Sequence, residues 1–575
     1  MKLEYLPNEI ILEIFDYLNA IHLIHAFHNV NLRLNKLLDT SFQSYCLDFR
    51  SISKYGFNII CQQHLPSIID KVSSLHLADD DETPNLPKIL LSNIFTLSRF
   101  THLKALSLYS IQSLDLLNEI ILQCHYITHL KLIQCFYENK ECQLINNIWS
   151  LPKLIDCHID GIMLKGICFS ELSIKSLSIK YLSIKNIICN IPYLSSVFQQ
   201  TPCLQRLCTT IACTEKIEKL PDSIPLLTKL TLSYHGSILS MRNIFQQMCN
   251  LHTLTINTSY LLSDGSEWEN ILVDYLPKLK YFRLKMSFQL PESNNLDITV
   301  DELLNTFRTD FWIKKHQWFV RCDWNTSDPF NNAILYTLPY LFDDFHFINE
   351  SCSKSTYSDE KQYCSYDHVK SLQYENSISN HLVSIPIVFL NITHLDIMLP
   401  FNEKLLRNIP SLNHLKSLDV TLLTGESTYH QLQLLLNRAP HLHILRFSHL
   451  SDLEMILFKI TNTSVRRLDF FTKESMLYSW YFNEDQCNVL ANSSLGQQCQ
   501  TLIIDIIRRT NVLYLINNMS NLRSLTFQCK DDKGPQKILP SIDDELIQWF
   551  DQHLPRTCSI SRNKTQSSII HVWIR

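Results

Sequence analysis

The chain is poor in glycine, with only 8 glycines among 575 residues. Phosphate-binding loops need several glycines close together, and neither a P-loop nor a GxGxxG pattern occurs. The chain also lacks a surplus of positive charge, because 51 lysines and arginines stand against 56 aspartates and glutamates, a formal net charge of −5. Nucleic-acid-binding surfaces need clustered positive charge, so the composition argues against a nucleic acid as the main partner.

Long apolar runs and paired cysteine motifs are missing as well. No segment approaches 18 uninterrupted apolar residues, so the sequence predicts no membrane span and no membrane partner. Glu4, Glu9 and Glu13 interrupt the only stretch near the N-terminus that could serve as a signal peptide. The 19 cysteines include no CxxC pair and are typical of free, buried thiols in a reducing compartment. We therefore expect an intracellular protein, cytoplasmic and/or nuclear.

The chain does contain a repeat. A six-residue pattern, apolar-x-x-Leu-x-apolar, occurs as LKALSL (103–108), ITHLKL (127–132), LTKLTL (227–232), LHTLTI (251–256), ITHLDI (392–397), LKSLDV (415–420), LHILRF (442–447), VRRLDF (465–470) and LRSLTF (522–527). Many neighbouring copies lie 23 or 24 residues apart, and a helical segment with a turn precedes many of them. Such units cannot cover their own apolar faces, so they stack into an array. An ordinary α/β sheet protein is the alternative, and the near-constant spacing disfavours it.

The segment Ile127-x-x-Leu130-x-Leu132-x-x-Cys135 resembles the cysteine-containing variety of leucine-rich repeat. That resemblance implies an α/β solenoid with parallel strands inside and helices outside. The repeat is lost between residues 290 and 366, a segment that contains Trp312, Trp318 and Trp324. Dense aromatic residues can form a binding platform. The more frequent outcome is an insertion that packs its own small core against the repeats.

The opening stretch LPNEIILEIFDYL (6–18) is apolar over nearly twice the stripe of roughly 100° that a helix needs to pack on one neighbour. This helix should therefore meet two surfaces. The stretch and the residues after it resemble an F-box, in the pattern Leu6-Pro7-x-Glu9-Ile10, Ile14-Phe15-x-x-Leu18, Leu23, Phe27, Val30, Arg33 and Leu37. Asn31 and Leu34 stand where members of that family often have cysteine and tryptophan.

An F-box followed by leucine-rich repeats resembles the F-box/leucine-rich-repeat family of substrate receptors for cullin-based ubiquitin ligases. The resemblance implies a three-helix F-box at 1–45. The repeat pattern places leucine-rich repeats at 46–289, a non-repeat insertion at 290–366, and further repeats with a C-terminal cap at 367–575. It implies that a Skp-type adaptor, and through it a cullin ligase, binds the F-box while the repeats bind a target protein. The adaptor-contacting residues, or those that order the contacting helix, would be Leu6, Pro7, Ile10, Ile14, Leu18, Leu23, Phe27, Val30 and Leu34. The alternative is a protein-binding scaffold whose N-terminal helices only cap the solenoid.

Residues that alternate with the buried ones should project from the concave sheet of such an array. The candidates for target binding on this basis are Lys229, Tyr281, Arg283 and Lys285, together with Trp312 and Trp318 from the insertion. In the second half the projecting positions include Asp396, Asp419, Asp469, Arg446 and Arg467.

Catalytic and metal-binding patterns are weak. Cys203, Cys208 and Cys213 are five residues apart, whereas zinc sites favour tighter knuckles. His441 and His443 flank Leu442 on an expected strand, where satisfied or solvent-facing side chains are usual. The acidic run 79–82 lacks the alternation of a calcium loop and is typical of a solvated turn. We expect no enzyme activity, no metal and no cofactor.

Overall fold

The structure is a computed structural model, and it divides the chain into two compact units. The first contains Met1–Leu232, Gln246–Leu251 and Arg575, and the second contains Ser233–Phe245 and His252–Ile574. The residues that the structure describes are 5–18, 20–28, 30–41, 45–92, 96–135, 142–161, 172–213, 220, 224, 226–292, 295–325, 328–348, 351–358, 363, 365–375, 387–403, 405–422, 426–449, 459–471, 480–532, 544–563 and 566–574.

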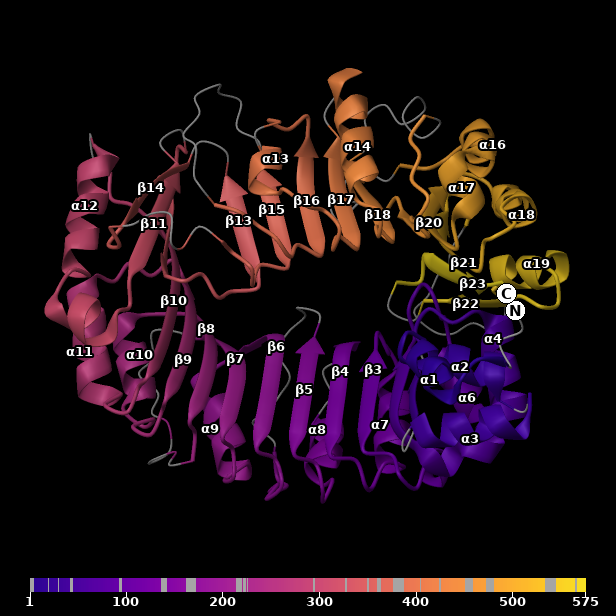
Figure 1. Cartoon of the computed structure of the whole chain (residues 1–575), viewed down its shortest axis with the longest axis horizontal. Helices are drawn as coiled ribbons and strands as arrows, with labels where there is room; N and C mark the ends of the chain where they lie inside the picture. Colours follow the sequence, from indigo (N-terminus) through magenta and orange to yellow (C-terminus); the bar gives the residue numbers. More distant parts are fainter. Residues whose placement is uncertain are drawn as a thin grey trace. The chain divides into compact units, whose positions relative to one another are not determined.

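The first unit opens with three helices and then alternates strands with helical segments. Its helical elements are α1 (Asn8–Asp16), α2 (Ala20–Phe27), α3 (Leu32–Ser41), α4 (Lys54–Ile59), η2 (Ile60–His64), α5 (Leu65–Ile68), η3 (Ile69–Lys71), α6 (Leu86–Ser92), η4 (Leu97–Arg99), α7 (Leu114–Leu122), α8 (Cys142–Trp149) and α9 (Ile191–Gln200). Its strands are β1 (Tyr45–Asp48), β2 (Val72–Ala78), β3 (Ala105–Tyr109), β4 (His129–Cys135), β5 (Asp156–Gly161), β6 (Tyr181–Cys189), β7 (Arg206–Ala212) and β8 (Lys229–His235), whose last residues belong to the second unit. Figure 1 shows α7 and α8 side by side along these strands, and they pack against each other.

Strands β1 to β7 pair in parallel and in chain order. The central residues of consecutive repeats lie opposite one another: Leu75, Leu106, Leu130, Cys157, Leu182 and Leu207. All of these side chains are buried. The predicted stacking of one short strand per repeat is confirmed.

The second unit contains the remaining elements. Its helical elements are α10 (Ile238–Phe245), α11 (Gly265–Tyr275), α12 (Leu296–Thr306), η6 (Phe311–His316), α13 (Leu405–Asn408), α14 (Glu426–Arg438), α16 (Glu484–Asn492), α17 (Ser494–Gln498), α18 (Arg509–Asn518) and α19 (Glu545–His553). Its strands are β9 (Thr253–Ser259), β10 (Tyr281–Gln289), β11 (Val320–Asn325), β12 (Asn332–Thr337), β13 (Asp344–Ile348), β14 (Ser351–Ser355), β15 (Ser371–Glu375), β16 (His394–Leu399), β17 (Ser417–Leu422), β18 (Ile444–His449), β19 (Arg467–Asp469), β20 (Thr501–Ile506), β21 (Ser524–Cys529), β22 (Ser559–Arg562) and β23 (Ile569–Trp573). Helices α16, α17 and α18 gather beside β20 (Figure 1).

The parallel register of the second unit also follows the leucine spacing. One register position runs through Phe345, Leu372, Leu395, Leu418, Leu445, Leu468, Leu502 and Leu525, all of them buried. Both units therefore stack leucine-rich repeats. In the second unit, the first and third apolar residues of the patterns lie in one core with the central leucines. The second ladder ends in antiparallel pairs of β21 with β23 and of β23 with β22.

Antiparallel strands replace the parallel ladder inside the segment 290–366. β10 pairs with β12, β12 with β11, and β11 with β14, each in antiparallel fashion. Among the described residues, the strands after β10 follow the order β10-β12-β11-β14, and the second ladder follows the order β13-β15-β16-β17-β18-β19-β20-β21-β23-β22. The parallel pairing of β13 with β15 shows that the repeats resume at residue 344, ahead of the boundary at 367 drawn from the sequence.

A candidate bilayer-crossing helix is not found in the part of the chain that the structure describes, because no helix there is both long and apolar enough.

Candidate functional site: an apolar face on the N-terminal helices

Helices α1, α2 and α3 share a small core of their own. Phe15 and Phe27 lie at its centre with ring centroids 5.0 Å apart. The buried members of this cluster are Ile11, Phe15, Leu23, Phe27, Leu34, Leu37 and Leu38. Apolar residues spaced three or four apart along each helix supply this core, as amphipathic helices require.

A second apolar stripe on α1 faces away from that core. Pro7, Ile10, Ile14 and Tyr17 follow one another at intervals of three or four residues, so they share one side of the helix. Ile10 is 41% exposed and Tyr17 is 84% exposed, while Ile14 is partly buried. The wide apolar arc of this helix is thus divided between an internal core and an exposed stripe.

Arg33 links this stripe to the start of α3. Its Nε donates to Asn8 Oδ1 at 2.8 Å and its Nη2 donates to the carbonyl oxygen of Leu6 at 2.6 Å. Asn31 caps α3, because its Oδ1 accepts from the backbone N–H of Leu34 at 2.8 Å. These bonds hold the N-terminal ends of α1 and α3 together.

Two exposed apolar residues accompany the end of α3 that Arg33 secures. Val30 is 54% exposed and Leu32 is 74% exposed. We call Pro7, Ile10, Tyr17, Val30 and Leu32 together the helical apolar face, because all five are exposed and belong to the three-helix segment. Exposed apolar groups of this kind are typical of a surface that a partner covers.

The nine residues predicted to contact an adaptor are therefore divided by the structure. Pro7, Ile10 and Val30 are exposed, and Leu6, Ile14 and Leu18 are partly buried. Leu23, Phe27 and Leu34 lie inside the three-helix core, so their side chains hold the helices together and are not on the surface. The sequence did not single out Tyr17 and Leu32, although Tyr17 continues the spacing of Ile10 and Ile14.

Helix α2 attaches the three helices to the first repeat. Ile21 and Ile24 are buried although they do not belong to the three-helix core, and α2 packs against β1 and η2. The rings of His28 and His64 meet with Nδ1 atoms 2.9 Å apart. The contact with the chain's own first repeat is thus made by α2.

One of the predicted target-binding residues, Lys285, already has a partner within the chain. Lys285 is buried, its ammonium lies 2.6 Å from Asp344 Oδ2, and it faces the rings of Tyr340 and Phe342. This ion pair engages the Lys285 ammonium, which was predicted to bind a target protein. Lys285 therefore stabilises the strands around it.

The tryptophans of the insertion belong mainly to its core. Trp312 is fully buried and its Nε1 donates to the carbonyl of Gly265 at 3.2 Å. Trp318 is partly buried, stacks on His316 with centroids 4.2 Å apart, and contacts Phe282 of β10. The insertion thus packs its own aromatic core against a repeat, as the alternative to a binding platform required.

The remaining candidates stay predictions. Tyr281 is 63% exposed and Arg283 is partly exposed on β10. Lys229 is exposed on β8. Lys229 lies in the first unit and the other two lie in the second.

Charged side chains of the second ladder pair with one another. Arg446 Nη1 lies 2.7 Å from Asp419 Oδ2, and Arg446 Nε lies 3.0 Å from Asp469 Oδ2. Both aspartates are buried. Burial acts to lower the pKa of Arg446, and the two carboxylates more than offset it, so that the pKa is raised. This network joins β17, β18 and β19 across neighbouring repeats.

Asp505 of β20 is also buried, but one of its carboxylate oxygens lacks a hydrogen bond among the described residues. Its side chain is 5% exposed, and the oxygen that lacks this bond is Oδ1. Burial raises the pKa of Asp505 to about 7, although the backbone of Gln528 acts in the opposite direction.

Metal-binding clusters of three or more histidine, cysteine or acidic side chains do not occur among the described residues. Cys203, Cys208 and Cys213 are partly exposed and form no disulfide. Burial raises the pKa of Cys135 to about 12 and also raises that of Cys157, so these thiols serve as small apolar core residues.

Comparisons with known proteins give a likeness to solved structures and no sequence match. No family model matches the chain, and no curated protein matches it. The crystal structure of a TLR13–ssRNA13 complex is 15% identical over 82% of this chain and 68% of that chain, with a TM-score of 0.27. The leucine-rich-repeat ectodomain of the plant membrane receptor kinase GASSHO1/SCHENGEN3 from Arabidopsis thaliana, solved with CASPARIAN STRIP INTEGRITY FACTOR 2, is 12% identical over 81% of this chain and 48% of that chain, with a TM-score of 0.19. The assignment of leucine-rich repeats rests on the strand register of this chain.

Proposed function

We propose that this chain is a non-catalytic substrate receptor of a cullin-type ubiquitin ligase inside the cell. In this proposal the helical apolar face binds a Skp-type adaptor, and the leucine-rich repeats bind a target protein. The observation that carries it is the exposure of Ile10, Tyr17, Val30 and Leu32 on helices that already have a complete core. The resemblance of residues 6–37 to an F-box agrees with this role for the face.

The mechanism requires no chemistry from the chain itself. Two partners bound to one molecule meet at a high effective concentration, which replaces a bimolecular encounter by an intramolecular one. The target's lysines would then lie near the ubiquitin-charged enzyme that the ligase recruits.

The test is co-expression of the full chain with a Skp-type adaptor, followed by co-purification and measurement of the dissociation constant. Ile10→Asp and Leu32→Asp each place a charge on the helical apolar face and should weaken binding by at least about thirtyfold, as loss of an interface hot spot does. Leu122→Asp is the matched control, because Leu122 is 54% exposed on α7, outside this face. Equal binding by all three folded variants would rule out the face as the adaptor site.

A second candidate is a protein-binding scaffold in which the three helices only cap the repeats. The packing of α2 on β1 and η2, with Ile24 fully buried, favours a capping role. The two roles are compatible, since capping uses α2 and docking uses α1 and the start of α3. Point variants separate them better than removal of residues 1–45, which would uncover the first repeat. A folded chain that binds no adaptor would leave capping as the sole role of these helices.

A further inference from the structure

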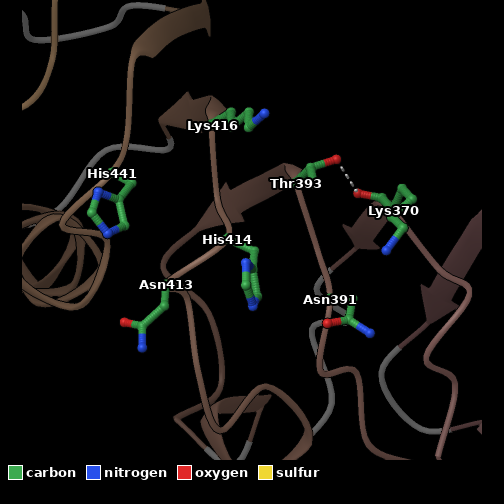
Figure 2. A pocket seen from close by; sticks show the side chains of 7 residues that line it. All are labelled: Lys370, Asn391, Thr393, Asn413, His414, Lys416 and His441. Atoms are coloured by element: carbon green, nitrogen blue, oxygen red, sulfur yellow. Dashed lines mark hydrogen bonds between the residues drawn. The ribbon is translucent and has the colours of Figure 1, made fainter. Parts of the chain in front are cut away.

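A basic pocket of about 480 Å³ lies in the second unit, where consecutive repeats enter their strands. Its volume falls within the range of small-molecule sites. The residues that line it are Lys370, Asn391, Thr393, Asn413, His414, Lys416 and His441 (Figure 2). The lining contains two ammonium groups, two imidazoles and three uncharged polar side chains, and no carboxylate.

The repeat explains why these side chains gather. Each strand is entered through one buried apolar residue, Ile392, Leu415 or Leu442. The residues directly before these three form one row of the lining: Asn391, His414 and His441. The residues that follow Val369, Ile392 and Leu415 form a second row: Lys370, Thr393 and Lys416. Stacking of the repeats therefore turns a sequence pattern into two parallel rows of polar groups.

The backbone beneath the second row is fixed by hydrogen bonds. The carbonyl of Lys370 accepts from the N–H of Thr393 at 2.8 Å, and the carbonyl of Thr393 accepts from the N–H of Lys416 at 2.8 Å. The hydroxyl of Thr393 also donates to the Lys370 carbonyl, at 3.2 Å (Figure 2). Since neighbouring strands lie about 4.8 Å apart, the two lysines project from backbone positions about 10 Å apart. Figure 2 shows them on opposite sides of Thr393.

We propose that this pocket binds a small ligand that carries two or more phosphate groups. Lysine ammonium groups are strong donors to phosphate oxygens, and two of them on one rigid edge can each take a phosphate. Both lysines are exposed and the residues that line the pocket include no carboxylate, so both charges are available. The polar edge of a parallel sheet is often merely solvated. Here the positive charge recurs on alternate repeats and no acidic side chain lines the space.

The test is isothermal titration of the full chain with sodium tripolyphosphate and, separately, with orthophosphate. Tripolyphosphate should bind at least about tenfold more tightly than orthophosphate, because a chain of phosphates reaches both lysines. The variant Lys370→Ala/Lys416→Ala should weaken tripolyphosphate binding by at least about tenfold, the effect of losing charge-assisted hydrogen bonds. Lys459→Ala is the matched control, since Lys459 is an exposed lysine of the same unit that does not line the pocket.

Three results would overturn the proposal. The first is the absence of binding heat with a folded wild-type chain, and the second is equal weakening by Lys459→Ala and the double variant. The third is binding of a doubly phosphorylated peptide without binding of tripolyphosphate, which would make the pocket part of a protein interface. The proposal does not depend on the adaptor, so the double variant should still co-purify with it. Each hypothesis can therefore fail separately.

Discussion

Replacing Asp505 by asparagine should stabilise the second unit in neutral and alkaline solution. The native carboxyl has a pKa of about 7 against an ordinary value of 3.8, because burial disfavours its charged form. Between these two values the native state binds a proton that the unfolded state has released. Stability therefore falls as the pH rises from about 4 to 7, and the full cost is present above pH 7.

The size of the effect follows from the difference in pKa. About three pH units correspond to roughly 4 kcal/mol of unfolding free energy at pH 8, of which roughly 2 kcal/mol is already lost at pH 5. Asparagine removes the charge but keeps an amide that needs partners of its own, at a cost of about 1–3 kcal/mol. We expect a net gain of about 2 kcal/mol at pH 8. The gain should be smaller by about 2–3 kcal/mol at pH 5.

Urea unfolding at several pH values, combined with amide hydrogen exchange of β20 and β21, measures this difference. Asp485→Asn is the control, because Asp485 is an exposed aspartate on α16 of the same unit. A free-energy difference between wild type and Asp505→Asn that is the same at pH 5 and pH 8 would refute the reasoning.

Three further predictions concern single contacts. Arg33→Ala should weaken adaptor binding by about tenfold while the repeats stay folded, because it releases the ends of α1 and α3; normal binding would show that the link is not needed. Asp344→Ala should lower the unfolding free energy by about 1–3 kcal/mol, because it leaves the buried Lys285 without its carboxylate, whereas Lys285→Met should cost less than about 1 kcal/mol in the same urea titration. Cys46 and Cys249 should react with a thiol reagent in the native protein, and the buried thiols only after unfolding; mass spectrometry of labelled peptides checks the order.

The leucine periodicity predicted the repeats well because the central leucine of each pattern lies opposite the central leucine of the next repeat in the sheet. Leu372, Leu395 and Leu418 are evenly spaced in the chain and lie opposite one another in the sheet. The start of the second ladder was missed because Phe345 and Phe347 fill its core positions, so the leucine pattern is absent there. A phenylalanine can fill the same core position as a leucine, but a pattern defined by leucines does not detect it.

The candidate site was harder to predict, for a different reason. An internal core and a partner-binding surface both require apolar side chains, so the sequence could not separate Leu23 and Phe27, which are inside, from Ile10 and Val30, which are outside. The charge of Lys285 was equally ambiguous. Its partner Asp344 lies 59 residues further along the chain. The repeat spacing predicts contacts between neighbouring repeats and does not predict this pair.

The antiparallel strands β11, β12 and β14 have a consequence for folding cooperativity. They end one ladder of hydrogen bonds, and a separate ladder begins at β13. In stacked repeats, each unit gains stability mainly from its nearest neighbours. Side chains bridge the break between the ladders, because Tyr336 of β12 packs against Phe345 of β13 and Lys285 of β10 pairs with Asp344. Cooperative unfolding across this break should therefore depend on these side-chain contacts and not on the backbone hydrogen bonds of the ladders.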